Sequence, residues 1–484
     1  MNTFKRFKYL SKRFYLFIYI FIIPYLCPNK ILKLMKASIA KGTRDFLPNQ
    51  VIKRKYIFDI IKSVFEIYGY VPIETPSFEL LSTLTGKYGE EGDRLLFKIL
   101  NNGDFLQKAD TEALCEKNSK KITAQISKRG LRYDLTVPFA RFVVMHENEL
   151  TFPFKRYQIQ PVWRADRPQK GRYQEFYQCD VDAIGSDSLM YEAELIKIYD
   201  DVFTKLKIPV EIKINNRKVL EEMSSAIGAK DKFMDITIAI DKLDKIGMEG
   251  VEKELSKRDL NSKTIESIKK YLEIDSIGGL TDWFEHQNID SSGLKELKTV
   301  FNYIYSIPLH NHVKYDATLA RGLNYYTGCI FEVKAMDAQI GSLGGGGRYD
   351  ELTEVFDRKG MSGVGISFGA ERIYDVMEEK NLFPDDLIHT LDILFVAFDD
   401  YTHREAFKLA SKLRKNNIKT DIYPAPAKMK KQMKYANAIA VPYVAIIGSN
   451  EMEKHIVTLK KMITGQQKEV PYDDLVNELK QKLM

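Results

Sequence analysis

Two long strand-like segments joined by a short polar turn constrain the fold of this 484-residue chain most strongly. Residues 157–164 and 173–184 alternate between polar and apolar side chains, and the polar residues 166–172 separate them. Other strand-like segments accumulate in direct succession around 130–183. Strands that follow one another directly favour an antiparallel sheet over a repeated β-α-β unit.

The remaining patterns divide the chain into domains. Apolar spacing predicts helices at 57–68, ended by Gly69, and at about 187–206, with an extended segment at 71–73. Residues 215–310 are rich in Lys, Glu, Ser and Asp at helical spacing, which predicts a helical insertion, and strand signals return at 315–370. Clean alternation then predicts strands at 391–397, 418–423, 442–448 and 456–461 and helices at 402–416, 428–439 and 472–482. We therefore predict one domain over 35–388 and a compact α/β domain over 389–484.

The net charge of +7 comes from a short N-terminal segment. Residues 1–34 contain seven Lys or Arg residues and no acidic residue, so the chain from Met35 onward is neutral. Within it, 389–484 carries 16 basic against 11 acidic residues. The C-terminal domain is therefore the basic part of the body, which hints at a polyanionic partner.

Residues 1–34 are a basic and apolar leader whose role the sequence leaves open. Its apolar run, 14–27, is shorter than the roughly 20 residues that span a bilayer and contains Pro24. Three interpretations remain: translated upstream sequence before a start at Met35, an organellar or membrane-targeting segment, or an anchor. Four widely spaced cysteines form no CxxC pair, which argues against a zinc motif or disulfide framework and favours the cytoplasm.

The second strand of the hairpin carries the strongest chemical signal. Alternation places Phe176, Gln178, Asp180 and Asp182 on one face, while the other face can supply a core. Arg164 lies on the same sheet. Such a set suits a ligand that carries both an ammonium and a phosphate, although a solvated sheet face is the alternative.

Three further segments are weaker signals. The glycines at 344–347 lack the Lys-Ser/Thr of a phosphate loop, and close approach of backbone to a flat ligand explains them equally well. Arg372 opens a helical pattern, where it gains nothing from the helix dipole, so a ligand role competes with a salt bridge. Tyr325 and Tyr326 follow Arg321 and suit either packing or a pocket for an aromatic substrate.

Taken together, five strings from Lys41 to the C-terminus resemble the histidyl-tRNA synthetases of the class II aminoacyl-tRNA synthetase family. Residues 69–76 are similar to motif 1, 164–182 to motif 2 and 363–372 to motif 3, while 131–136 and 321–326 resemble the histidine-binding signatures. The resemblance implies an α+β fold. Its catalytic domain would hold an antiparallel sheet with a helical insertion, followed by an α/β anticodon-binding domain.

The resemblance also implies residue roles. The histidine would be held by Asp134, Thr136, Arg164, Gln178, Asp182, Arg321, Tyr325 and Tyr326. The ATP would be held by Arg164, Phe176 and Arg372, with Arg164 and Arg321 as the catalytic cations at the α-phosphate. The acceptor end of the tRNA would meet Arg167, Gln169 and Arg172. Asn324 departs from the family string, which usually has Asp there.

The implied activity is ATP-dependent ligation of L-histidine to tRNA(His) through histidyl-adenylate. ATP is a substrate, Mg²⁺ accompanies it, and the partners are tRNA(His) and a second copy of the chain, with no stable membrane partner. The main alternative is a catalytically silent, synthetase-like regulatory subunit of histidine biosynthesis. Such a protein would be expected to lose parts of 321–326 and the C-terminal domain, and both are present.

Overall fold

The computed structural model describes residues 36–85, 89–169, 171–320, 325–388 and 390–483. The leader at 1–34, Arg321 and Asn324 lie outside these described residues. The fold below is that of the compact unit Asp45–Met484. No helix within the described ranges is both long and apolar enough to cross a membrane.

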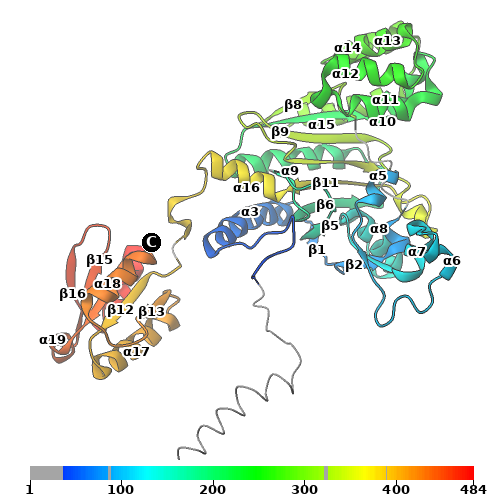
Figure 1. Cartoon of the computed structure of the whole chain (residues 1–484). Coiled ribbons are helices and arrows are strands. Elements are labelled where there is room, and N and C mark those ends of the chain that lie inside the picture. The colour runs from blue at the N-terminus through cyan, green and yellow to red at the C-terminus, as the bar shows by residue number, and fades with distance from the viewer. Residues whose placement is uncertain (1–35, 86–88, 170, 321–324, 389, 484) are drawn as a thin grey trace, which may run out of the picture. The chain divides into compact units, whose positions relative to one another are not determined.

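An eight-stranded sheet forms the centre of the larger, N-terminal region (Figure 1). Its strand order is β1-β5-β6-β11-β10-β9-β7-β8. The six strands from β5 to β7 pair antiparallel, and only the outer pairs β1·β5 and β7·β8 are parallel. The strands are β1 Val71–Pro72, β5 Phe154–Trp163, β6 Glu175–Ile184, β7 Val210–Asn216, β8 His312–Tyr315, β9 Cys329–Ala335, β10 Gly344–Tyr349 and β11 Gly363–Gly369. The predicted antiparallel sheet is therefore confirmed.

Two long helices cover one face of this sheet. The helix predicted at 57–68 is confirmed as part of α3 (Pro48–Ile67), and the one predicted at 187–206 is α9 (Met190–Lys205). Cys179, Val181 and Ala183 of β6 pack into the same apolar core as these helices. The opposite face of β6, with its polar side chains, is thereby left to form a cavity.

One predicted local structure was wrong. Thr136–Met145, inside the stretch interpreted as strands, is the helix α8; its apolar side is buried, and the Asp134 carboxylate accepts the N–H of Val137 in its first turn. The glycines at 344–347 lie within the stretch predicted to hold strands and form part of β10, because the edges of β9 and β11 supply hydrogen-bond partners on both sides. Tertiary pairing overrides local propensity at both places.

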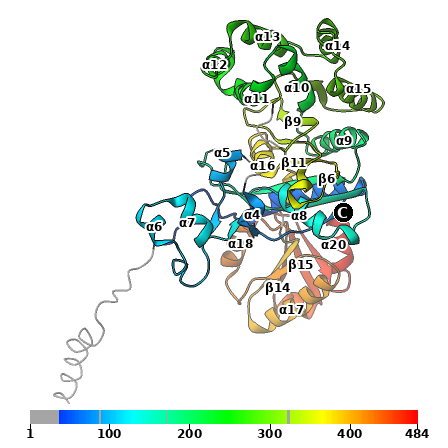
Figure 2. The same ribbon diagram turned by 90° about the vertical axis from the view of Figure 1, so that its right-hand side faces the viewer.

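Helices fill the segment between β7 and β8. They gather into one cluster in Figure 2, and α15 also packs on α9. Their bounds are α10 Arg217–Ala226, α11 Phe233–Ile240, α12 Leu243–Lys257, α13 Ser262–Leu272, α14 Ile277–His286 and α15 Ser292–Tyr305. A small sheet, β2-β4-β3, lies earlier in the chain, formed by Phe78–Leu80, Arg129–Leu131 and Lys98–Ile99.

The C-terminal domain is a five-stranded sheet in the order β13-β12-β14-β15-β16. Helices α17 and α20 share a core with one face, and α18 packs on the other. Every predicted element is present: β12 Ile393–Ala397, α17 Asp400–Lys415, β13 Thr420–Ile422, α18 Met429–Ala438, β14 Tyr443–Ile447, β15 Ile456–Lys461 and α20 Leu475–Leu483. Two short elements were missed, α19 (Ser449–Glu453) and β16 (Gln467–Pro471).

Candidate active site

A cavity of about 530 Å³ opens on the polar face of the large sheet. Its lining comes from β6, β10, β11, the start of α8, the start of α16 (Ala370–Glu379) and the loop between β5 and β6. Most predicted site residues line it: Asp134, Thr136, Arg164, Arg172, Phe176, Gln178, Asp182, Tyr325, Tyr326 and Arg372. Arg167 and Gln169 lie on the β5–β6 loop and are not part of the lining, and Arg321 is outside the described residues.

Arg164 is held between two aromatic rings at one end of the cavity. Its Nε donates to the Tyr133 carbonyl at 3.1 Å. Its guanidinium carbon lies 4.2 Å from the ring centroid of Tyr133 and 5.2 Å from that of Phe176. These contacts fix the guanidinium plane in place, which suits bidentate binding of a carboxylate or a phosphate.

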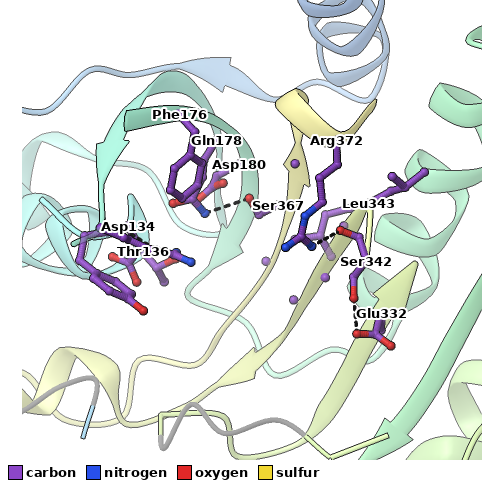
Figure 3. A pocket seen from close by; sticks show the side chains of 18 of the residues that line it. Asp134, Thr136, Phe176, Gln178, Asp180, Glu332, Ser342, Leu343, Ser367 and Arg372 are labelled. Carbon is purple, nitrogen blue, oxygen red and sulfur yellow. Dashed lines mark hydrogen bonds between the residues drawn. The ribbon is translucent and has the colours of Figure 1, made fainter. Parts of the chain in front are cut away.

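Arg372 is held by two backbone carbonyls on another side of the cavity. Its Nε donates to Gly171 at 3.1 Å and its Nη1 donates to Ser342 at 2.7 Å. The Ser342 hydroxyl in turn donates to Glu332, and Figure 3 shows this chain across the cavity from Phe176, Gln178 and Asp180. Since Gly171 belongs to the β5–β6 loop, Arg372 also fixes that loop against the sheet.

Arg132 anchors the segment that carries Tyr133 and Asp134. It is fully buried, and its Nη1 and Nε donate to the carbonyls of Thr75 at 2.7 Å and Pro161 at 2.8 Å. A buried guanidinium with carbonyl partners is rigid, since breaking either bond would leave a buried donor unpaired. The segment similar to motif 1 is therefore tied directly to the cavity.

Three buried carboxylates and one buried guanidinium form the deepest part of the site. Asp134, Asp180 and Asp182 are at most 4% exposed, and Arg156 is 0% exposed. Asp182 is engaged at both oxygens: the Tyr349 hydroxyl donates to Oδ1 at 2.6 Å, and Arg156 Nη2 lies 2.7 Å from Oδ2. Burial raises the pKa of Asp182 and raises that of Asp180 to about 7.

This electrostatic arrangement predicts that Asp180→Asn stabilises the protein at high pH. Burial is the main cause of the raised pKa; the Asp182 and Asp134 carboxylates add to it, while Arg156 and Ser367 oppose it. When the pKa of a carboxyl is higher in the folded than in the unfolded protein, the free energy of unfolding falls as pH rises between the two pKa values. We expect the free energy of unfolding of Asp180→Asn, relative to wild type, to grow by roughly 3 kcal/mol from pH 5 to pH 8.

Urea unfolding at both pH values, without ligands, measures this change. Asp187→Asn is the matched control, since it removes an exposed carboxylate just beyond β6. The same stability difference at pH 5 and pH 8 for Asp180→Asn would contradict the raised pKa.

Glycines form part of the cavity surface, and we call Gly344, Gly345, Gly346 and Gly365 the glycine floor. Gly365 lies opposite Asp182 in the β6·β11 register, and a Cβ there would lie 1.9 Å from Asp182 Oδ1. A Cβ on Gly346 would lie 2.1 Å from the Gly365 carbonyl oxygen. The glycines therefore allow β6, β10 and β11 to pack closely, while close approach of their backbone to a flat ligand stays a prediction.

Sequence reasoning left several residues of the site without a role. Asp180 was placed on the correct face of β6, but no role was assigned to it. Arg156 and Ser367 were not recognised, because they reach the site only through the strand register: Arg156 lies opposite Asp182, and Ser367 lies opposite Asp180. The alternation of side chains along one strand does not show which residues of the neighbouring strands lie opposite them.

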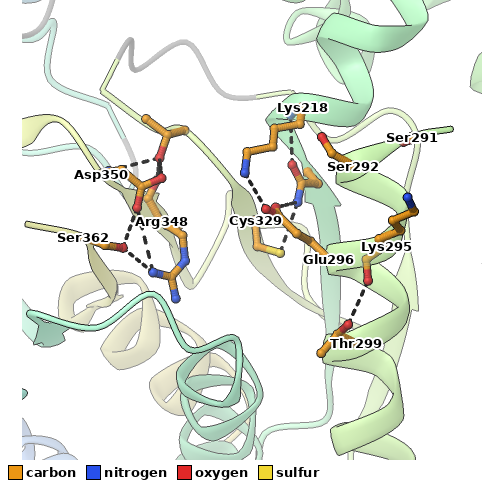
Figure 4. Close-up of polar contacts among 12 residues, drawn as sticks. Lys218, Ser291, Ser292, Lys295, Glu296, Thr299, Cys329, Arg348, Asp350 and Ser362 are labelled. Atoms are coloured by element: carbon orange, nitrogen blue, oxygen red, sulfur yellow. Dashed lines mark hydrogen bonds and ion pairs between the residues drawn. The ribbon is translucent and has the colours of Figure 1, made fainter. Parts of the chain in front are cut away.

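A second cavity, of about 400 Å³, lies beside Arg348, and most of the charged side chains that line it have partners within the protein. Lys218 pairs with Glu296, and the Asp350 carboxylate accepts hydrogen bonds from Ser362 and Thr327 (Figure 4). Arg348 donates to both oxygens of Glu192. Across the described ranges, no group of three or more His, Cys, Asp or Glu residues is placed to hold a metal ion.

Comparisons with known proteins agree with this geometry. A family model described as Histidyl-tRNA synthetase matches residues 104–373, and one described as Anticodon binding domain matches 392–482. The chain is 52% identical over 445 residues to the histidine-tRNA ligase of Porphyromonas gingivalis, covering 91% of this chain and 98% of that protein. It is 51% identical over 449 residues to that of Bacteroides fragilis, covering 92% and 99%.

Solved structures give the same result. The histidyl-tRNA synthetase of Nostoc sp. PCC 7120 is 29% identical, with a TM-score of 0.76, and the match covers 93% of this chain and 100% of that one. A protein from Bacillus halodurans C, described as an ATP phosphoribosyltransferase regulatory subunit/histidyl-tRNA synthetase, is 20% identical with a TM-score of 0.65 and shares the fold. The predicted α+β fold with a C-terminal α/β domain is confirmed.

Proposed function

Because the chain belongs to the histidyl-tRNA synthetase family and is a histidine-tRNA ligase that uses ATP, we propose how its residues carry that reaction. One observation supports the proposal most directly. A single cavity holds two positioned guanidinium groups, an aromatic ring and several buried carboxylates. The regulatory-subunit alternative is not favoured, since the relatives at about 50% identity are ligases over nearly their whole length.

We propose that ATP lies between Phe176 and Arg372. Adenine would stack on the Phe176 ring, and Arg372 would bind the distal phosphates. Arg164, beside Phe176, would then meet the α-phosphate together with the histidine carboxylate. Arg321 would contribute the second cation at that phosphorus, as the family resemblance implies.

The histidine would occupy the deeper part of the cavity. Asp134, Thr136 and Gln178 would receive its α-ammonium, and Tyr325 and Tyr326 would line the imidazole side. Asp182 would support the histidine site from the side away from the cavity opening, since its two oxygens are engaged by Tyr349 and Arg156. A neutral apolar rival would leave these buried polar groups unpaired, so discrimination of roughly 10⁴ needs no editing site.

The proposed first step is an in-line displacement. A histidine carboxylate oxygen attacks the α-phosphorus, the bond to the bridging oxygen breaks, and pyrophosphate leaves with that electron pair. Arg164 and Arg321 align the reactants and stabilise the charge on the α-phosphate, so no covalent enzyme intermediate is needed. The terminal ribose hydroxyl of tRNA then attacks the acyl carbon of the adenylate and releases AMP.

We propose that the ATP phosphates would carry Mg²⁺, which would offset part of their charge. Mg²⁺ prefers oxygen ligands and keeps most of its coordination to phosphate and water. The Glu332 carboxylate would be a ligand for this Mg²⁺, because Glu332 lines the cavity and is joined to Arg372 through Ser342.

The tRNA would contact two separate parts of the chain. Arg167, Gln169 and Arg172 lie on the β5–β6 loop, which Arg372 fixes at the cavity, and would meet the acceptor end. The C-terminal domain, with its surplus of basic residues, would bind the anticodon of tRNA(His). We propose domains at 35–388, with the helical insertion at about 215–310, and at 389–484.

We further propose a homodimer and a cytoplasmic location. Apolar side chains next to the motif 1 segment are exposed, among them Ile67 at 73%, Phe78 at 47% and Leu80 at 59%. Exposed apolar groups clustered in one part of a surface mark a site of association. The role of residues 1–34, organellar targeting included, stays outside this proposal.

Arg321→Ala is expected to abolish adenylate formation without unfolding the protein. The reason is the loss of one of two cations that stabilise the charge at the α-phosphorus, an effect of at least about 10² on rate. Histidine-dependent exchange of pyrophosphate into ATP measures it, with thermal unfolding as the control for folding. Exchange at the wild-type rate would exclude Arg321 from the reaction, whereas absence of histidine-dependent exchange in the wild type would contradict the proposed function itself.

A further inference from the structure

We propose that Arg54, which lies on α3 outside the first cavity, is a positioning residue for ATP that acts through Glu371. The inference rests on the proposed function, because it takes Phe176 and Arg372 as parts of the ATP site. Three observations carry it. They are a buried ion pair between α3 and α16, the contact of Glu371 with β6, and the place of Glu371 in the cavity wall.

The buried ion pair joins α3 to the start of α16, which packs beside it (Figure 1). Arg54 Nη1 lies 2.5 Å from Glu371 Oε2, and the two residues are only 6% and 4% exposed. The guanidinium carbon of Arg54 also lies 4.1 Å from the ring centroid of Phe46 and 5.4 Å from that of Tyr177. Aromatic rings and a carboxylate thus replace water around this guanidinium, and loss of the cation would leave the Glu371 charge buried without it.

Glu371 joins the two elements that carry the proposed ATP ligands. It lies in the first turn of α16, directly before Arg372. Its Oε1 accepts a long hydrogen bond, 3.5 Å, from the backbone N–H of Tyr177, which follows Phe176 in β6. Arg54 therefore holds, through one carboxylate, the start of α16 against the Phe176 end of β6.

The strand register explains why a side chain is needed at this point. β11 ends at Gly369, opposite Gln178 of β6, and the chain turns there into α16. The Glu371 carboxylate continues the hydrogen bonding of β6 past the end of β11. An acidic residue in the first turn is also favoured by the helix dipole, so its carboxylate is well placed for this contact.

The charge of Glu371 gives Arg54 a specific effect on ATP. Glu371 and Arg372 both line the first cavity, so the carboxylate belongs to the wall of the proposed phosphate site. The charge of Arg54 offsets that of the carboxylate. Without Arg54, the carboxylate would repel the triphosphate and attract Arg372, and both effects weaken ATP binding. Histidine is a zwitterion without net charge, so the same change affects its binding little.

The test compares Arg54→Met with Lys53→Met, which breaks the neighbouring and more exposed pair between α3 and Glu378 of α16. Neither Lys53 nor Glu378 lines the first cavity. We expect Arg54→Met to raise the Kd for ATP, measured by titration calorimetry, roughly 5- to 30-fold. The KM for histidine in pyrophosphate exchange should stay within about twofold of wild type, and Lys53→Met should change neither quantity beyond that range. A Kd for ATP in Arg54→Met equal to that in Lys53→Met would overturn the proposal.

Neutralising Glu371 separates the effect of its charge from a simple loosening of α16. In Arg54→Met/Glu371→Gln, the new amide oxygen can still accept the Tyr177 N–H, and no buried charge is left without its partner. We expect the Kd for ATP of this double variant to return to within about threefold of wild type. A Kd as high as that of Arg54→Met would overturn the role of the charge pair.

Thermal unfolding checks the folding of each variant. Arg54→Gln makes the same prediction as Arg54→Met, because it also removes the cation, and it replaces Arg54→Met if that variant does not fold.

Arg372→Gln distinguishes failure of this inference from failure of the proposed function. If Arg372→Gln raises the Kd for ATP and Arg54→Met does not, only the role of Arg54 is wrong. If neither variant changes that Kd, the ATP phosphates do not lie at this end of the cavity and both proposals fall.

Discussion

Replacement of Gly365 by Ala is expected to abolish histidine activation. The new Cβ would lie 1.9 Å from Asp182 Oδ1, far inside contact distance. Asp182 cannot turn away cheaply, because Tyr349 donates to that same oxygen at 2.6 Å and Arg156 lies 2.7 Å from the other. Either the strand or the buried ion pair must shift, and a displacement of about 1 Å at a reacting site lowers the rate roughly 10²-fold.

Pyrophosphate exchange and thermal unfolding together measure this effect. Gly278→Ala is the matched control, because Gly278 lies in α14 with no atom within 4 Å of its added Cβ. That variant should keep full activity and gain up to about 1 kcal/mol from helix propensity. Wild-type exchange in Gly365→Ala would show that Asp182 is not held in the position described.

Replacement of Arg348 by Met is expected to lower the free energy of unfolding by about 3–5 kcal/mol. Arg348 donates to Glu192 through Nε at 2.5 Å and Nη2 at 2.7 Å, and both residues are almost fully buried. The substitution leaves the Glu192 carboxylate buried with no cation. It also removes donors from the carbonyls of Ser186 and Ser188, which accept hydrogen bonds from Nη1 and Nη2.

Urea unfolding of the wild type and the variant tests this prediction. The control is Asp473→Ala, which breaks an exposed pair with Lys412 and should leave the unfolding midpoint unchanged. A midpoint for Arg348→Met equal to that of this control would mean that the buried pair contributes nothing. Loss of activity without loss of stability would instead place Arg348 in the reaction, contrary to its position outside the first cavity.

The structure was predictable from the sequence where the pattern of polar and apolar residues lies within a single strand or helix. Alternation along β6 correctly placed Phe176, Gln178, Asp180 and Asp182 on one face and Cys179 on the other, because side-chain direction in a strand has a period of two. The alternating elements of the C-terminal domain were also predicted, with the short α19 and β16 as exceptions. The roles assigned to the site residues by family resemblance remain predictions.

The failures share a physical cause, which is dependence on partners far away in the chain. The apolar run of α8 resembles a strand, and it forms a helix whose buried face packs against residues far away in the chain, such as Ile184 and Tyr349. The glycines of β10 have low strand propensity by themselves, and the strand forms because β9 and β11 supply its hydrogen bonds. Arg156 becomes a site residue only through its position opposite Asp182.

The glycine floor has a consequence for inhibitor resistance. A flat inhibitor lying on Gly344, Gly345 and Gly346 would contact main-chain atoms, which a point mutation changes only by adding a side chain. At Gly344 and Gly346 such a side chain would approach neighbouring atoms to 2.7 Å and 2.1 Å, so the mutation would damage the enzyme along with the drug site. Resistance to a compound of this kind would have to arise at Gly345 or from residues around the floor, which narrows the routes of escape.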